Sequence, residues 1–348
     1  MAASVLVAAG VIAAGVIVAA GRGTKPPAAS ATATAPAAAP AAVAVTKLGH
    51  RLLGVRAGWQ LFALGQQEMV RIQLARGRVT RTQIPPLMSS GPVSLLAGPH
   101  EAIIRPLDFV PGYLVPDGQK ARTLRGVLSH GGMVFPGPRP GQVWTLISGR
   151  AVHLAGFDGG KLGAVIRLPA GDGWLVTSDD RGYLLIYRKD QVYDARPGVT
   201  RRITAGSVAA VGPTRWLAVH CRPRHRCSDV VIDPATGTHR HLGHRRIGSA
   251  VPGIISPDGS TAALLRGGAA DPITVHLLSL NSGTDRAVPV HADRGLFAPG
   301  NMAWSPDSRW LFVIAVNGKL VAVSASTGAV RGIGTALPPV IQLAVRAG

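Results

Sequence analysis

Residues 305–330, SPDSRWLFVIAVNGKLVAVSASTGAV, decide the fold that we predict for this chain. The segment opens with a Ser-Pro-Asp turn, continues with two apolar runs separated by Asn-Gly-Lys, and ends in Ser-Thr-Gly. Pro fixes φ, and Asp307 can hydrogen-bond to the nearby backbone, which favours a tight turn. The apolar runs, 310–316 and 320–323, lack strict alternation and are typical of strands buried on both faces. The segment therefore predicts a buried β-hairpin, in which Asp307 shapes the entering turn rather than forming a site.

The same order of turn, strand, gap, strand and Gly tail recurs along the chain. A Ser-Pro-Asp turn also begins at Ser256, and comparable tails end at Gly237, Gly283 and Gly328. These landmarks are about 45 to 50 residues apart, a period typical of propeller blades rather than leucine-rich or ankyrin repeats. Weaker copies occupy 58–79, 141–160, 173–190 and 215–237, and residues 91–128 fit least well.

The repeats predict an all-β fold, a β-propeller of about seven four-stranded blades, although about six or eight would also fit. The 348 residues include 44 Gly and 27 Pro, with 5% aromatic residues, which suits many short strands joined by tight turns. Ring closure usually places both chain ends in one blade. We therefore expect VIQLAVR, residues 340–346, to pair with strands near residues 48–65.

The first 21 residues contain no charged side chain. At about 1.5 Å per residue, a helix of about 20 residues would span the core of a bilayer, about 30 Å. We therefore predict three regions: a transmembrane anchor at 1–21, a flexible Ala/Pro/Thr-rich linker at 22–46 and the β-propeller at 47–348. A cleaved signal peptide is the alternative, but the apolar run is longer than usual and lacks a basic n-region.

Two features of the sequence predict opposite orientations for this anchor. Arg22 and Lys25 follow the span and no basic side chain precedes it, so the positive-inside rule would keep the main domain in the cytoplasm. The two cysteines discussed below favour export. The sequence therefore predicts a single-pass protein of the cell membrane with an extracytoplasmic propeller.

The C-terminal half resembles TolB-like and WD40-like β-propellers of the bacterial envelope. The similarity rests on SPDGSTAALL at 256–265, SPDSRWLFV at 305–313 and the D-x-x-TG tail at 233–237. This resemblance implies a propeller fold and an extracytoplasmic scaffold with protein partners. It implies no particular activity.

The only two cysteines, Cys221 and Cys227, lie in the Arg-rich stretch HCRPRHRC between two predicted strands. A disulfide would close a loop of about seven residues and stabilise the hairpin by about 2 kcal/mol, and it would persist only in an exported domain. Zinc is the competing interpretation because His220 and His225 flank the cysteines, but the spacing is not a standard zinc-knuckle pattern and the neighbouring arginines repel a cation. Free thiols are the third alternative.

Other candidate residues are better explained by structure than by chemistry. Asp258 and Asp307 are expected to form turns, as is the acidic pair in SDDRG at 178–182. His220 is predicted to be a core or cross-strand residue. GFDGGKLG at 156–163 lacks the Ser/Thr and the helix of a phosphate loop. Five tryptophans are expected to pack between blades: Trp59, Trp144, Trp174, Trp216 and Trp310.

The formal net charge of +20 predicts attraction to polyanions. No helix-turn-helix, zinc-finger or RNP signature accompanies it, which disfavours nucleic acid. Enzymatic motifs are missing as well, so we expect no catalytic residue, cofactor or metal. The favoured function is a non-catalytic binding or assembly scaffold for a protein or an anionic envelope polymer, and the alternative is a propeller enzyme at the central channel. The oligomeric state is not predicted.

Overall fold

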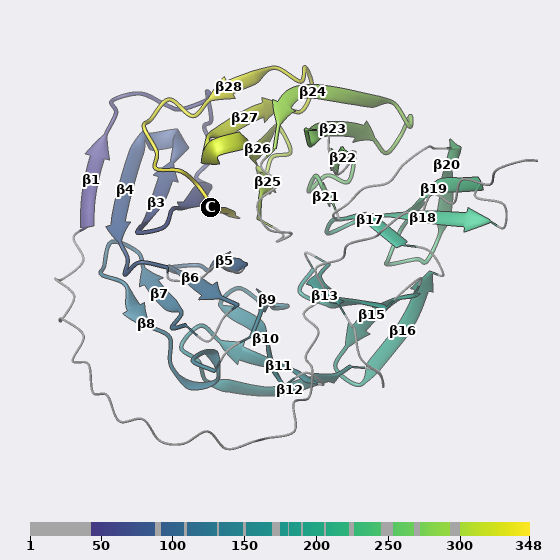
Figure 1. The fold of residues 1–348 in the computed structure, drawn as a ribbon, viewed down its shortest axis with the longest axis horizontal. Helices are drawn as coiled ribbons and strands as arrows, with labels where there is room; N and C mark the ends of the chain where they lie inside the picture. Colours follow the sequence, from purple (N-terminus) through teal and green to yellow (C-terminus); the bar gives the residue numbers. More distant parts are fainter. Residues whose placement is uncertain are drawn as a thin grey trace, which may run out of the picture.

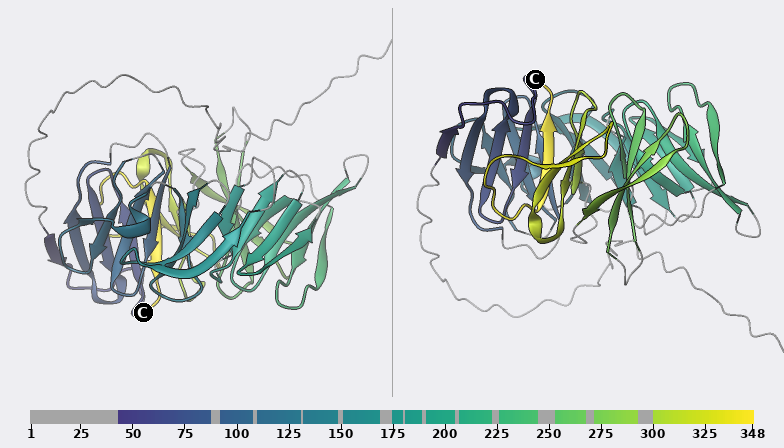
Figure 2. Two further views of the ribbon diagram at one scale, coloured as in Figure 1. Left: turned by 90° about the horizontal axis from the view of Figure 1, so that it is seen from below. Right: turned by 90° about the horizontal axis from the view of Figure 1, so that it is seen from above.

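The structure is a computed structural model of the chain. It describes residues 43–348 except 88–91, 108–109, 131, 149–150, 169–174, 180, 189–190, 205–206, 223–225, 245–252, 268–271 and 293–299. Its strands surround a central axis, and the fold is an all-β propeller (Figure 1). Seen from the side, the strands form a disc (Figure 2). The predicted anchor at 1–21 lies outside the described residues, and no helix within them is long and apolar enough to span a membrane.

The strands form six sheets, described here in chain order. The first contains, from its outer edge inward, β1 (Val43–Lys47), β4 (Arg78–Gln83), β3 (Glu68–Gln73), β2 (Gln60–Leu64) and β29 (Gln342–Arg346). The second contains β5 (Val93–Ala97), β6 (Glu101–Pro106), β7 (Tyr113–Pro116) and β8 (Arg122–Thr123). The third contains β9 (Val134–Pro136), β10 (Gln142–Ser148), β11 (Ala151–Gly156) and β12 (Lys161–Arg167).

The remaining sheets complete the ring. The fourth contains β13 (Leu175–Ser178), β14 (Leu184–Arg188), β15 (Gln191–Arg196) and β16 (Val199–Thr204). The fifth has eight strands in the order β20 (His239–His244), β19 (Arg226–Ile232), β18 (Trp216–Arg222), β17 (Ser207–Val211), β21 (Gly253–Ile255), β22 (Thr261–Arg266), β23 (Thr274–Ser279) and β24 (Asp285–His291). The sixth contains β25 (Met302–Trp304), β26 (Trp310–Ile314), β27 (Leu320–Ser324) and β28 (Val330–Gly332). Short 3-10 helices are η1 (Leu74–Arg76), η2 (Gly126–Leu128) and η3 (Val316–Gly318).

One end of each four-strand meander faces the axis. Figure 1 shows β5, β9, β13, β17, β21 and β25 nearest the centre, and β29 contacts both β5 and β25. The last strand therefore occupies the innermost place in the first sheet. There it pairs antiparallel with β2, from Gln60 opposite Arg346 to Leu64 opposite Gln342. The predicted pairing between the two ends of the domain is confirmed.

The N-terminal strand β1 adds a fifth, outer strand to this sheet by pairing with β4. It begins at Val43, inside the range predicted as linker. Ala44 to Lys47 of β1 are exposed, so the strand is joined by backbone hydrogen bonds rather than by burial. The domain boundaries otherwise remain a prediction.

The hairpin that led to the fold prediction is formed by β26 and β27, with Trp310 opposite Ser324 and Ile314 opposite Leu320. Every residue of β26 is buried. Its even-numbered residues pack into the apolar cluster shared with the first sheet, while Leu311 and Val313 pack into the cluster shared with β22–β24. Burial on both faces explains the unbroken apolar run. The strand ends two residues earlier than predicted, because Val316 starts the exposed turn η3.

The described tryptophans of the predicted set pack between blades. Trp59, Trp144, Trp216 and Trp310 are all at least 92% buried. Trp59 of the first sheet meets Phe312 of the sixth edge to face, with ring centroids 5.7 Å apart. Trp174 lies outside the described residues.

Candidate functional site

The strands nearest the axis are poor in ionisable side chains. In the order β29, β5, β9, β13, β17, β21 and β25 they read QLAVR, VSLLA, VFP, LVTS, SVAAV, GII and MAW. Arg346 is the one ionisable residue in these strands. They contain no carboxylate, histidine or cysteine that could act as acid, base, nucleophile or metal ligand.

Arg346 is used to hold the ring closed. Its Nη1 donates to the carbonyl of Gly98 at 2.8 Å, and its Nη2 donates to Gln60 Oε1 at 2.6 Å and to Asp117 Oδ2 at 2.7 Å. Arg71 Nη1 reaches the same carboxylate oxygen at 2.6 Å. We call Arg71, Asp117 and Arg346 the closure cluster. It joins β29 and β3 of the first sheet to the turn after β7 of the second.

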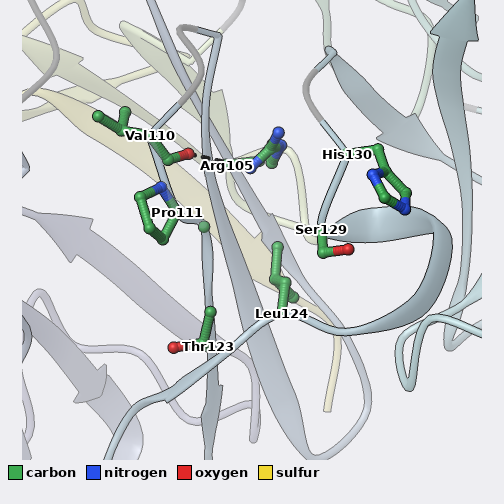
Figure 3. A pocket seen from close by; sticks show the side chains of 8 residues that line it. Arg105, Val110, Pro111, Thr123, Leu124, Ser129 and His130 are labelled. Carbon is green, nitrogen blue, oxygen red and sulfur yellow. Dashed lines mark hydrogen bonds between the residues drawn. The ribbon is translucent and has the colours of Figure 1, made fainter. Parts of the chain in front are cut away.

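A pocket of about 310 Å³ lies in the second sheet, at the opposite end of β6 from Asp117 (Figure 3). We call it the Arg105 pocket. Its walls come from the end of β6, the segment entering β7, and the chain from β8 through η2. The lining residues are Arg105, Val110, Pro111, Gly112, Thr123, Leu124, Ser129 and His130.

Arg105 is the charged group of the pocket, although only 2% of the residue is exposed. Its Nη1 donates to the carbonyl of Val110 at 3.2 Å. None of the ion pairs found among the described residues includes it. Burial lowers the pKa of Arg105 below its ordinary value, but a guanidinium remains protonated at physiological pH. The pocket therefore contains a buried cation whose described partner is a single carbonyl.

Figure 3 shows how the side chains surround this guanidinium. Val110 and Pro111 lie on one side of it, and Ser129 and His130 lie on the other. Ser129 Oγ donates to the carbonyl of Gly126 at 2.7 Å. The pocket combines one fixed cation, a few hydroxyl and imidazole groups and an apolar wall.

Two glycine features shape the pocket. A Cβ at Gly112 would lie 2.6 Å from Leu124 Cδ1 and 3.0 Å from Arg105 Cδ, so glycine leaves the space through which the arginine passes. On the opposite side, Val127 N donates to the carbonyl of Gly159 at 3.1 Å. Gly159 has a φ of +87°, and its Cβ would lie 2.1 Å from the carbonyl oxygen of Arg125. The segment 156–163, which was compared with a phosphate loop, therefore makes a close backbone contact through Gly159 and supports η2.

The structure places Cys221 and Cys227 directly opposite each other on β18 and β19. Opposite residues in antiparallel strands have Cα atoms about 4.5 to 5.5 Å apart, within the range of disulfides. The bond itself stays a prediction. His220, in the same strand, stacks edge to face on His239 at 6.3 Å, and burial lowers its pKa. His225 lies outside the described residues, within which no group of three potential metal ligands is found.

Asp258 and Asp307 occupy the turns between β21 and β22 and between β25 and β26. Asp258 Oδ1 accepts from Ser256 Oγ at 2.6 Å and from Ser260 N at 3.0 Å. Asp307 Oδ1 accepts from Ser305 Oγ at 2.5 Å. Burial opposes ionisation of Asp258, but these hydrogen bonds outweigh it and lower its pKa. Neither carboxylate lines the Arg105 pocket.

Asp179 of the SDDRG segment also lies in a turn, between β13 and β14. Its Oδ1 accepts from the backbone N–H groups of Arg181 and Tyr183, both at 2.9 Å. The residue is fully buried, and burial raises its pKa. Asp180 lies outside the described residues.

The predicted site residues and the Arg105 pocket are therefore separate. Sequence reasoning missed Arg105, Asp117 and Arg346. The available signal for Arg105 was one arginine within the apolar strand AIIRP, because a cation there must be either paired or functional.

Comparison with known proteins supports the fold. No family model matches the chain, and no curated protein matches its sequence. A candidate 6-phosphogluconolactonase from Bacteroides uniformis is 12% identical, with a TM-score of 0.51, and the match covers 83% of this chain and 100% of that one. An oligogalacturonate lyase in complex with manganese is 10% identical, with a TM-score of 0.50 and coverage of 82% and 97%. A candidate TolB from Agrobacterium tumefaciens is 13% identical, with a TM-score of 0.43 and coverage of 62% and 84%. The propeller arrangement of the strands agrees with the fold that the sequence resemblance implied, and these identities establish nothing beyond the fold.

Proposed function

We propose that this protein is a membrane-anchored, extracytoplasmic β-propeller that serves as a non-catalytic binding or assembly scaffold for an acidic protein or an anionic envelope polymer. The distribution of charge is the observation that carries the proposal. The innermost strands contain a single ionisable residue, Arg346, whereas basic residues mark the outer edge of the disc. On the outermost strands these are Lys47, Arg122, Lys161, Arg167, Arg201, Arg202, Arg240, Arg286 and Arg331. We call this set the basic rim.

Charged edge strands are common because they discourage edge-to-edge aggregation. Either sign of charge would serve that purpose, yet the outermost strands contain one acidic residue, Asp285, which is bonded to Arg266 and His276. Glu68 and Asp194 are likewise engaged in ion pairs, and Asp233 in a turn. A rim of one sign produces a field that attracts polyanions.

The innermost strands argue for binding over catalysis. An enzyme at the central channel would need carboxylate, imidazole or thiol groups there, and these strands supply none. The similarity to a lactonase and a lyase concerns the fold alone.

The proposal includes seven blades. Five sheets of four or five strands each give one blade, and the eight-stranded sheet consists of two meanders, β17–β20 and β21–β24. Among the described residues, the only strand pairing that joins them is a parallel contact of two residue pairs at the axis, between Ala210 and Gly253 and between Val211 and Ile254. Such a contact between innermost strands is expected of neighbouring blades. An experimental structure with six blades would refute this count.

The proposed location is tested by membrane topology. A reporter enzyme that is active only outside the cytoplasm, fused after Gly348, should be active if residues 1–21 form an anchor with the propeller exported. A fused reporter active only in the cytoplasm should be silent. Alkylation of Cys221 and Cys227 in the native, unreduced protein should fail if they form the proposed disulfide.

The basic rim is tested by binding to polyglutamate, with neutral dextran as the control polymer. Arg167, Arg201 and Arg202 are exposed on β12 and β16, and no described residue accepts a hydrogen bond from their side chains. Changing all three to Gln should weaken polyglutamate binding at least tenfold and flatten its salt dependence. The matched control changes Arg51, Arg56 and Arg309 to Gln, three exposed residues outside the outer strands. Equal losses in both variants would show that net charge, rather than the rim, causes binding.

A further inference from the structure

Arg105 differs from the other two buried arginines of the first two sheets in having no described carboxylate partner. Arg71 and Arg346 are 8% and 7% exposed, and both share the carboxylate of Asp117. Arg105 is more deeply buried, and its described partner is the carbonyl of Val110 alone. An unpaired buried charge opposes folding, so its retention calls for a compensating anion.

The pocket is built to receive that anion. The guanidinium has five N–H donors, of which one is bonded to a described residue. It lies between the Val110–Pro111 wall and the Ser129–His130 wall, and Gly112 provides the space for its stem (Figure 3). The Gly126–Gly159 backbone contact holds the η2 side in place. The cation is thus fixed before any ligand arrives, which reduces the entropic cost of binding.

We propose that the Arg105 pocket binds a small monocarboxylate, whose carboxylate pairs with the guanidinium of Arg105 and whose apolar body contacts Val110, Pro111 and Leu124. A carboxylate matches the planar fork of one guanidinium. Phosphate or sulfate would need further cations or backbone donors, and no lysine or second arginine is among the described residues that line the pocket. A volume of about 310 Å³ is at the lower end for ligand sites, which favours a molecule of few heavy atoms.

The test uses the full chain, purified in detergent, with butyrate as the probe in thermal unfolding and ligand-observed NMR. Butyrate should raise Tm in a saturable manner, while uncharged butyramide and inorganic phosphate should not. Arg105→Met should abolish the butyrate effect. Arg309→Gln, which removes one exposed charge far from the pocket in sequence, should retain it.

Several results would overturn the proposal. These are the absence of a saturable butyrate effect, its persistence in Arg105→Met, or tighter binding of phosphate. Binding of acetyl-glutamate amide without binding of butyrate would assign the site to a protein side chain instead of a free small molecule. Asp108, which lies outside the described residues, is the nearest acidic residue in sequence. If Asp108→Asn alone made butyrate bind, Asp108 would be the natural partner and the pocket would not be a ligand site.

Discussion

In the closure cluster, two guanidiniums converge on one carboxylate, whereas in the Arg105 pocket a guanidinium has a carbonyl as its one described partner. Both regions belong to the first two sheets and both bury arginine. Their difference separates two uses of a buried charge. A paired charge fixes how two blades meet, and an unpaired one is retained at a loss of stability that only a ligand can offset. Removing the charge of a paired site should therefore lower the free energy of unfolding, whereas removing the charge of an unpaired site should not.

The largest effect is expected from Asp117→Asn, which removes the charge that faces both Arg71 and Arg346. Two buried guanidiniums would lose their counter-ion, so the free energy of unfolding should fall by about 3–4 kcal/mol, toward the low end for buried pairs because Asp117 is partly exposed. Denaturant titration measures this change. The control is Glu68→Gln, which breaks a part-buried pair with a single arginine, Arg81, whose side chain is more exposed than those of Arg71 and Arg346, and should cost only about 1 kcal/mol. Equal losses would mean that the closure cluster contributes no more than this single ion pair.

The second prediction concerns the wall of the Arg105 pocket. Gly159→Ala should lower the free energy of unfolding by about 2–3 kcal/mol, because it combines an unfavourable φ with a clash against Arg125. Gly163 has a similar φ of +80° and open space around it, so Gly163→Ala should cost about 1–2 kcal/mol. The difference between the two variants isolates the clash. If both lost the same stability, the contact with Arg125 would be adjustable and the pocket wall would not be rigid.

The third prediction is that removing a buried charge does not lower the free energy of unfolding, in contrast to the first. Arg105→Met keeps most of the packing volume and removes the unpaired charge, so without ligand it should leave the free energy of unfolding unchanged or raise it by about 1 kcal/mol. The same denaturant titration applies. A loss comparable to that of Asp117→Asn would show that Arg105 is a structural residue.

These contrasts also explain what could be predicted from sequence. The β26–β27 hairpin was predictable because its turn, its Asn-Gly connection and its apolar strands are adjacent in the chain. The pairing of β29 with β2 followed from ring closure, a property of the whole fold. The closure cluster was not predictable, since Asp117 and Arg346 are brought together only by the closed ring. Arg105 could be recognised in the sequence as an arginine in an apolar strand. Whether an acidic residue lies beside it depends on the folded structure and could not be predicted.

The smallest effect concerns Asp179, a buried carboxylate of the fourth sheet. Like Arg105, it is an ionisable group whose charged form is disfavoured by burial. Burial raises its pKa above the usual 3.8, so the folded protein binds the proton more tightly than the unfolded chain does. Its contribution to stability is therefore complete below pH 3.8 and is lost as the pH rises through the raised pKa. Asn can accept the same backbone hydrogen bonds through its side-chain oxygen. Asp179→Asn should consequently gain stability over the parent as the pH increases from 3.5 to 7, in unfolding titrations at matched salt. A constant difference between Asp179→Asn and the parent across this range would mean that the carboxylate is well solvated.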